Sequence, residues 1–225
     1  MIRKVPLVTG EYYHVLNKSV GGAAVFRNQR EYAQMLSLIK YYQYQSATIS
    51  YSQMVYLRKF DKILDNKWAR DVLKDDGKWV NIIAYCLMPT HIHFLIQQKE
   101  DGGIKEFMRR IQSSYACYFN RRNKRKGPLW IGRFKGILIK DDSQLLHVTR
   151  YIHLNPTTAG LVENPEDWKY SSYQMYINRR LDGNHFIQVE TTLDPIEYKN
   201  FVMKRRDYQK EIGLMKSLSQ ADELE

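Results

Sequence analysis

Four segments of the chain have the composition of β-strands. Each is rich in β-branched and aromatic residues, and its apolar positions either alternate with polar ones or run together. Gly21 and Gly22 predict a turn after the first segment, and Pro89 separates the second from the third. The predicted strands cover residues 11–20 (EYYHVLNKSV), 78–89 (KWVNIIAYCLMP), 91–98 (HIHFLIQQ) and 133–140 (RFKGILIK).

Apolar residues at helical spacing predict amphipathic helices between these strands. The first covers residues 28–44 and the second residues 102–124. A third, over residues 141–156, begins with an Asp or Ser cap, and we expect it to end near Pro156 because the residue before a proline disfavours helical geometry. Residues 46–77 have a mixed helical pattern, compatible with an inserted or extended helical hairpin.

The resulting order, β-α-β-β-α-β followed by a further helix, predicts an α+β fold. It matches the ferredoxin-like split βαβ arrangement, an antiparallel sheet with helices on one face. We expect one domain over residues 1–175, with residues 46–77 as a helical insertion. Residues 176–225 are expected to form a C-terminal extension that is partly helical and ends in an acidic tail.

Composition is that of an ordinary globular protein. The chain has 225 residues, 44% hydrophobic and 26% charged, and no apolar run approaches the ~20 residues of a membrane span. The first residues lack the apolar core of a signal peptide, so a cytoplasmic protein without a membrane partner is expected. Cys86 and Cys117 are too few for a disulfide framework or a zinc site, and both are expected to be small buried hydrophobes.

Positive charge is concentrated in one part of the chain. The net charge is +11, and residues 101–150 alone hold 12 Lys or Arg against 4 Asp or Glu. Such a block indicates a polyanionic partner, although a solvated basic surface would give the same pattern. The 17 tyrosines add rings that could stack on bases.

His91 and His93 interrupt the apolar run LMPTHIHFLI. They lie two residues apart in a predicted strand, so their side chains point to the same face. The pair is compatible with inert, hydrogen-bonded histidines and with two ligands of one metal ion, since neutral imidazole is a common ligand.

The helix over residues 141–156 offers partners for this pair. Tyr151 and Asn155 are four residues apart and share a helical face with His147. Asn155 supplies an amide oxygen, a hard donor suited to Mg²⁺ or Mn²⁺. Tyr151 supplies a phenol that could attack phosphorus. Each residue alone is compatible with a structural role, but together they predict a third ligand and a nucleophile.

At this point the sequence resembles the REP-associated branch of the single-tyrosine HUH (IS200-like) transposases. The resemblance covers most of residues 10–175 and follows the family's motifs in order. These motifs are YHVLNKSVGGAAVF, YCLMPTHIHFLI, FMRRIQSSYACYFNRRNKRKGPLWIGRF, YIHLNPTTAGLV and DWKYSSY. Two departures are Thr90, where the family usually has Asn, and NPTTAG, which lacks a basic residue common after this proline.

The resemblance implies a chemistry. His91, His93 and Asn155 would be the metal ligands for Mg²⁺ or Mn²⁺, and Tyr151 the nucleophile. Such enzymes nick single-stranded DNA near a hairpin, form a 5′-phosphotyrosine and leave a free 3′-OH without ATP. Hairpin-bearing single-stranded DNA is the expected partner, bound by a monomer or homodimer. The residues expected to face the DNA are Arg109, Arg110, Arg121, Arg122, Lys124, Arg125, Lys126, Arg133 and Lys135.

Three other functions remain compatible with the sequence. One is a domesticated hairpin DNA-binding protein with little or no catalysis, and another is a metal-dependent phosphodiesterase that uses water and leaves Tyr151 idle. The third is a ferredoxin-like RNA-binding module, which would give no reason for the histidine pair. Tyr115 and Tyr118 are rival nucleophiles on the basic helix, but their apolar spacing favours packing.

Overall fold

A computed structural model describes residues 6–60, 77–178 and 186–206 of the chain. Its sheet has the strand order β2-β3-β1-β4, and all neighbouring strands are antiparallel. The strands are β1 (Tyr12–Lys18), β2 (Val80–Met88), β3 (His91–Gln98) and β4 (Lys135–Leu138). The helices are α1 (Gln29–Tyr42), α2 (Tyr51–Phe60), α4 (Gly103–Arg122), α5 (Asp142–Thr158), α6 (Tyr173–Ile177) and α7 (Pro195–Met203). The predicted ferredoxin-like α+β fold is confirmed.

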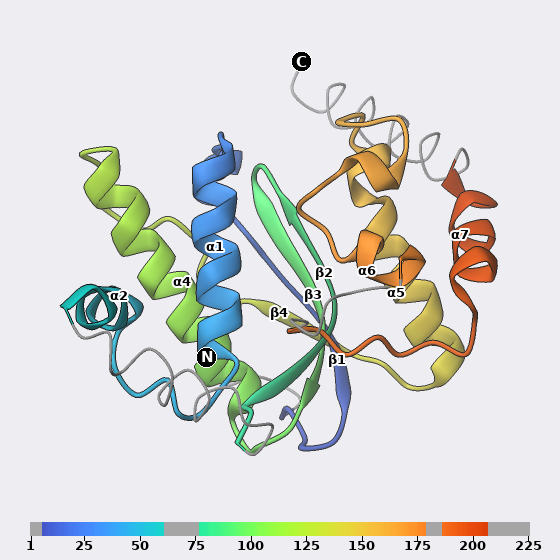
Figure 1. Cartoon of the computed structure of the whole chain (residues 1–225), viewed down its shortest axis with the longest axis horizontal. Coiled ribbons are helices and arrows are strands. Elements are labelled where there is room, and N and C mark those ends of the chain that lie inside the picture. The colour runs from blue at the N-terminus through green and yellow to red at the C-terminus, as the bar shows by residue number, and fades with distance from the viewer. Residues whose placement is uncertain (1–5, 61–76, 179–185, 207–225) are drawn as a thin grey trace.

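The two crossover helices, α1 and α4, cover one face of the sheet (Figure 1). Alternate β3 residues, Ile92, Phe94 and Ile96, point into the core on this side, which also holds the apolar faces of the two helices. Met35 of α1 and Phe107 of α4 are fully buried there. The helical periodicity of the sequence therefore identified the faces that pack.

Helix α5 lies on the opposite face of the sheet (Figure 1). Cys86 of β2, Leu95 of β3 and Ile152 of α5 belong to a second, smaller buried cluster. Since β3 side chains alternate, this is also the face of His91 and His93. The predicted Tyr151 helix and the histidine pair therefore share one side of the sheet.

The β2–β3 hairpin turns at Pro89 and Thr90. The Pro89 carbonyl accepts the backbone N–H groups of Val25 and Phe26, at 2.8 and 3.1 Å. The Thr90 carbonyl accepts the backbone N–H of Ser19 at 2.8 Å. Two regions far apart in sequence, residues 19–26 and the hairpin turn, are thus joined at the end of the sheet where His91 begins β3.

Two sequence expectations need correction. Helix α5 continues through Pro156 to Thr158, because a proline in the last turn removes only its own N–H from the helix, and the Pro156 carbonyl still accepts the N–H of Leu161. Cys86 is buried as expected, but Cys117 is exposed. Cys117 follows buried Tyr115 by two residues, so it faces the solvent side of α4.

Two segments of less regular sequence are partly described. Helix α2, at residues 51–60, falls within the predicted helical insertion, and residues 61–76 of that prediction lie outside the described residues. In the C-terminal segment α7 begins at a capping box, in which Asp194 accepts the Glu197 N–H and Glu197 accepts the Asp194 N–H. The predicted acidic tail lies outside the described residues.

His153 ties α5 to the segments that follow it. Its Nδ1 pairs with the Tyr198 hydroxyl of α7 and its Nε2 with the Ser172 hydroxyl, both at 2.7 Å. All three side chains are fully buried. Burial lowers the pKa of His153 to about 3, so the ring is neutral at pH 7 and its two nitrogens supply one donor and one acceptor.

Replacing His153 with phenylalanine is expected to lower the free energy of unfolding by about 1–3 kcal/mol, because the Tyr198 hydroxyl would stay buried without its partner. Urea denaturation followed by tryptophan fluorescence measures this. His147→Phe is the control: His147 is exposed, and a phenylalanine there keeps the ring contact with Phe201 of α7, so the free energy of unfolding should change by less than about 0.5 kcal/mol. Equal stability of the two variants would contradict the prediction.

In residues 6–60, 77–178 and 186–206, no helix combines the length and the apolar character that crossing a bilayer requires.

Candidate active site

Three histidines meet on the α5 face of the sheet. In the β1–β3 register Leu16 lies opposite His93 and Lys18 opposite His91, so these side chains share a face. His14, two residues before Leu16, is on the same face, and its Nε2 lies 3.0 Å from Nδ1 of His93. The rings of His14 and His93 stack at 5.2 Å, while those of His91 and His93 meet edge to face at 5.0 Å.

Tyr151 of α5 lies against this cluster. Its ring centroid is 5.9 Å from that of His93 and 5.9 Å from that of His14, edge to face in both cases. Tyr151 remains 41% exposed, whereas His93 is 5% exposed. The structure therefore brings the predicted nucleophile and a predicted ligand together, with one side of the phenol accessible from solvent.

Burial governs protonation in this cluster. It lowers the pKa of His14 and of His91 to about 4, and that of His93 well below its usual value, with neighbouring His91, His14 and Lys18 adding to the last shift. The imidazoles are therefore neutral at pH 7 and carry free lone pairs. Burial also raises the pKa of Tyr151, and a hydrogen bond from the Asn155 side chain opposes that rise.

Asn155 lies one turn after Tyr151 and is largely buried. Its Nδ2 donates to the Tyr151 backbone carbonyl at 3.0 Å. This bond fixes the amide orientation and leaves the Oδ1 atom for another partner. The Nδ2 atom of Asn155 is thus hydrogen-bonded to Tyr151, and Oδ1 is the atom that a cation would bind.

The donor set fits a divalent cation. The Nδ1 atom of His91 lies 2.9 Å from the Thr90 hydroxyl, and that of His93 pairs with His14, so Nε2 of each ring is left for a ligand bond. Metal-binding histidines usually engage their second nitrogen in this way. Within the described ranges no three His, Cys, Asp or Glu residues form a metal cluster, so a third protein ligand would be of another type, such as the Asn155 amide oxygen.

The other tyrosines and histidines singled out by sequence lie elsewhere. Nδ1 of His147 is 2.8 Å from a guanidinium nitrogen of Arg150, and its ring is 5.7 Å from that of Phe201, so it contacts α7 rather than the histidine cluster. Tyr115 is fully buried among α1 and α4 and donates to the Val25 carbonyl. Tyr118 packs against Tyr115 at 5.9 Å. Both occupy the face of the sheet away from His93.

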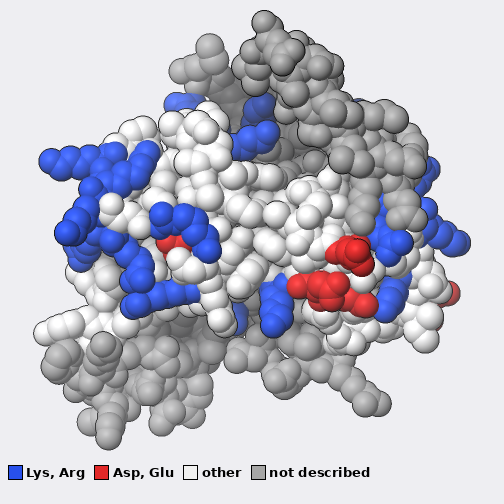
Figure 2. Space-filling view, turned by 90° about the horizontal axis from the view of Figure 1, so that it is seen from above, with Lys and Arg blue, Asp and Glu red and all other residues white. Residues whose placement is uncertain are grey.

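Several of the predicted basic residues gather where α4 ends. Arg121, Arg122, Lys124 and Lys126 are exposed there. We call residues 121–128, which hold these side chains, the basic loop. Figure 2 shows Lys and Arg side chains massed at the edge of the molecule on the α4 side. The chain leaving this loop returns to the sheet beside the hairpin, since Leu129 accepts the N–H of Val20 at 3.0 Å. Ser19, the residue before Val20, donates its backbone N–H to the Thr90 carbonyl. Residues 19 and 20 therefore connect the basic loop to the β2–β3 hairpin.

Lys18 and Lys135 bring positive charge onto the histidine face itself. Lys135 of β4 pairs with Leu16, which pairs with His93, so the three side chains lie in one row across the sheet. Lys18 lies directly opposite His91 in the next row. Both lysines are exposed. Arg133, two residues before Lys135, is exposed as well.

Arg125 has a different environment from its basic neighbours. Its guanidinium donates to the Asn120 side chain at 3.0 Å and to the Gly127 and Pro128 carbonyls at 3.2 and 2.7 Å. Lys124, just before it, has a left-handed backbone with φ of 49°. Arg125 therefore closes the loop that presents the other cations.

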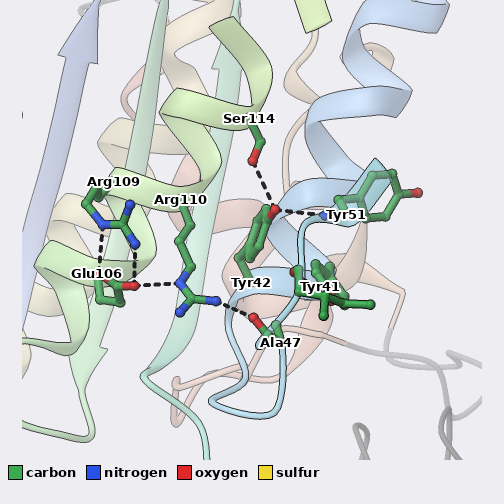
Figure 3. A network of polar contacts seen from close by, with 9 residues as sticks. Tyr41, Tyr42, Ala47, Tyr51, Glu106, Arg109, Arg110 and Ser114 are labelled. Carbon is green, nitrogen blue, oxygen red and sulfur yellow. Dashed lines mark hydrogen bonds and ion pairs between the residues drawn. The ribbon is translucent and has the colours of Figure 1, made fainter. Parts of the chain in front are cut away.

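Arg109 and Arg110 are held by Glu106 (Figure 3). Both guanidinium groups approach the Glu106 carboxylate to 2.6 Å and, with Arg109 contributing most, lower its pKa to about 2. Arg110 also donates to the Ala47 carbonyl, and next to it the Tyr42 hydroxyl accepts from the Tyr51 N–H. These two arginines join α4 to the loop before α2, away from the basic loop.

Sequence reasoning missed His14 and Lys18. His14 lies in a predicted strand, but only the pairing register places it beside His93. Lys18 is one of many charged residues in the sequence, and only the strand pairing places it opposite His91 in the candidate site.

The family model of the IS200-like transposases matches residues 49–155, a range that contains the histidine pair, Tyr151 and Asn155. The predicted resemblance to the IS200-like transposases is confirmed over this range. A protein of Haemophilus influenzae named as a REP-associated tyrosine transposase is 35% identical over 101 residues, 40% of this chain and 57% of that protein. A REP-associated tyrosine transposase of Escherichia coli is 26% identical over 101 residues, 44% of this chain and 58% of that protein.

The chain thus spans little more than half the length of these two relatives. Among solved structures, a REP-associated tyrosine transposase bound to a REP hairpin matches with a TM-score of 0.53 at 16% identity. The match covers 86% of this chain and 93% of that one. At this level of identity it establishes a shared fold.

Proposed function

We propose that this chain nicks and rejoins single-stranded DNA through a covalent 5′-phosphotyrosine, with Tyr151 as the catalytic nucleophile. The observation that carries the proposal is the position of the Tyr151 ring, 5.9 Å from His93 and on the same face of the sheet as His91. A nucleophile beside potential metal ligands is the arrangement that assisted phosphoryl transfer requires.

His91, His93 and Asn155 are the proposed ligands of Mg²⁺ or Mn²⁺. A bound cation would polarise the scissile phosphate and offset the charge that develops on it. Thr90 and His14 hold the two rings by their Nδ1 atoms, at 2.9 and 3.0 Å, which fixes the direction of each Nε2. The Asn155 Nδ2 bond to the Tyr151 carbonyl fixes the amide in the same way.

The proposed step conserves the phosphodiester bond energy. The Tyr151 oxygen releases its proton to solvent and attacks phosphorus, a tyrosyl O–P bond forms, and the P–O3′ bond breaks, with the departing oxygen taking up a proton from solvent to leave a free 3′-OH. Rejoining is the reverse, in which a 3′-OH attacks the phosphotyrosine and releases the phenol. Because burial raises the pKa of Tyr151, the phenol is protonated at pH 7, and the hydrogen bond from Asn155 helps to stabilise its anion.

Hairpin-bearing single-stranded DNA is the proposed partner. The solved structure of the same fold is bound to a REP hairpin. The exposed cations of the basic loop in the present chain have the positive charge that binding DNA phosphates requires. We propose that the exposed cations Lys18, Arg121, Arg122, Lys124, Lys126, Arg133 and Lys135 contact phosphates, while Arg125 shapes the loop. Arg109 and Arg110 are the weakest candidates of the predicted set because Glu106 already neutralises them in part. The protein is proposed to act in the cytoplasm, as a monomer or homodimer.

Incubation with end-labelled hairpin DNA and Mn²⁺, followed by a denaturing gel, tests the proposal. The expected result is a cut strand with a free 3′-OH and a labelled adduct that protease digestion converts to a smaller species. Cut DNA without an adduct would indicate hydrolysis by water instead. Binding with neither product would indicate a hairpin-binding protein without catalysis.

Neutralising two cations of the basic loop should weaken DNA binding in a salt-dependent way. In Arg121→Gln/Lys124→Gln, each lost phosphate contact is expected to reduce the slope of log affinity against log salt by ~0.7 for a single strand. Fluorescence anisotropy between low and moderate salt measures the slope. Lys99→Gln/Lys105→Gln removes the same charge from exposed positions near the start of α4 and should leave the slope close to wild type. Equal slopes for the two double variants would remove the loop from the interface.

A further inference from the structure

His14 is buried beside the proposed metal site without being one of its predicted ligands. It is 8% exposed, and its ring is sandwiched between two neighbours of the site. One is His93, stacked at 5.2 Å with an interplanar angle of 16°, and the other is Tyr151, edge-on at 5.9 Å. The Nε2 atom of His14 approaches Nδ1 of His93 to 3.0 Å.

Two imidazole nitrogens at this distance must share one proton, one ring donating and the other accepting. If His93 donates from Nδ1, its Nε2 keeps a free lone pair. If His14 donates instead, Nε2 of neutral His93 carries the proton and cannot bind a cation. Nδ1 of the neighbouring His91 is also engaged, by the Thr90 hydroxyl at 2.9 Å. Both rings therefore offer Nε2 to a cation only if His93 donates from Nδ1.

We infer that His14 is a positioning residue that accepts a hydrogen bond from Nδ1–H of His93 and thereby fixes the tautomer and direction of that ligand. The inference rests on the proposed function, because it concerns the same site. The β-sheet makes the contact rigid: His14 lies opposite Leu95 in the β1–β3 register, and Leu95 belongs to the buried cluster under α5. His14 also forms part of the wall against which the Tyr151 ring rests.

The first test reads the tautomer directly. Nitrogen-15 NMR of imidazole-labelled, metal-free wild-type protein at neutral pH is expected to show His93 protonated at Nδ1 and unprotonated at Nε2, and His14 unprotonated at Nε2. The assignment comes from the loss of each signal in the matching histidine variant. A His93 ring protonated at Nε2 would overturn the inference. This readout needs neither DNA nor a cation, and it needs the variants only for assignment.

The second test measures Mn²⁺ affinity without DNA, by the electron paramagnetic resonance signal of the free ion. His14→Phe keeps the ring stacking but removes the acceptor, and affinity is expected to fall by ~10- to 100-fold, the usual effect of losing the partner of a metal-binding histidine. His14→Gln places an amide oxygen near the Nε2 position and should restore most of the affinity. Tyr12→Phe, two residues earlier on the same face of β1, is the control and should bind as wild type does.

The outcomes separate this inference from the proposed function. Wild-type-like binding by His14→Phe, with binding lost in His91→Ala, would overturn the role of His14 and leave the metal site intact. An equal loss in His14→Phe and Tyr12→Phe would also overturn it, since the effect would then not be specific to the acceptor. Failure of wild-type protein to bind Mn²⁺ would overturn the metal site and the inference together.

Discussion

Tyr151→Phe is expected to abolish both nicking and the covalent DNA adduct while leaving hairpin affinity within about twofold of wild type. The substitution removes only the phenolic oxygen, so the ring still packs against His14 and His93 and the sheet face is unchanged. The cations proposed to bind phosphates lie on other elements. Denaturing gels with end-labelled DNA measure cleavage and adduct, and anisotropy measures binding.

Tyr115→Phe is the matched control, since it deletes a hydroxyl from a buried tyrosine on the other side of the sheet. Its hydroxyl donates to the Val25 carbonyl, so some stability is lost, but nicking by the folded variant should persist. An adduct that survives in Tyr151→Phe and disappears in Tyr115→Phe or Tyr118→Phe would move the active site to α4 and overturn the assignment.

His91→Ala and His93→Ala are expected to reduce nicking by at least ~100-fold, because each removes one of two proposed imidazole ligands and metal assistance contributes several kcal/mol to such reactions. Asn155→Ala should cause a smaller loss, since water can replace one neutral oxygen donor. The nicking rate is measured over a series of Mn²⁺ concentrations, where a ligand variant should require more cation than wild type.

Ile92→Val is the control for these variants. Ile92 lies between the two histidines in sequence, but its side chain enters the core on the opposite face of β3. It should lose some stability, by about 0.5–1.5 kcal/mol, and keep wild-type dependence on Mn²⁺. A chelator should stop the reaction of wild-type protein and of Ile92→Val. Nicking that is unaffected by His91→Ala or by chelation would exclude the proposed metal site.

Most of the fold could be predicted because its signals are local. The spacing of Met35 and Ile39, or of Phe107 and Ile111, identifies a helix and its buried face without knowledge of the rest of the chain. The same holds for the histidine pair, whose common face follows from strand geometry alone. His14 could not be found in this way, because its position beside His93 depends on a pairing register between strands 79 residues apart.

The total positive charge could be predicted from the sequence, but the partner of each basic side chain could not. Arg121 and Arg125 are equivalent as sequence, yet Arg121 is exposed and the guanidinium of Arg125 binds carbonyl groups of its own loop. Arg110 likewise is engaged by Glu106 and the Ala47 carbonyl. Such pairings depend on the path of the backbone after a helix ends, and here that path includes a left-handed lysine at position 124, which composition does not reveal.

The burial of His153 has a consequence for how sequences of this kind can diverge. His153 follows Tyr151 by two residues and points to the other side of α5, where it binds Tyr198 of the C-terminal segment. Substitutions that loosen α7 would therefore shift the helix that carries the proposed nucleophile, although α7 itself is far from the histidines in sequence. We expect the C-terminal segment to be inherited together with α5, and exchange of either one alone between relatives to yield hybrids that have lost the proposed activity.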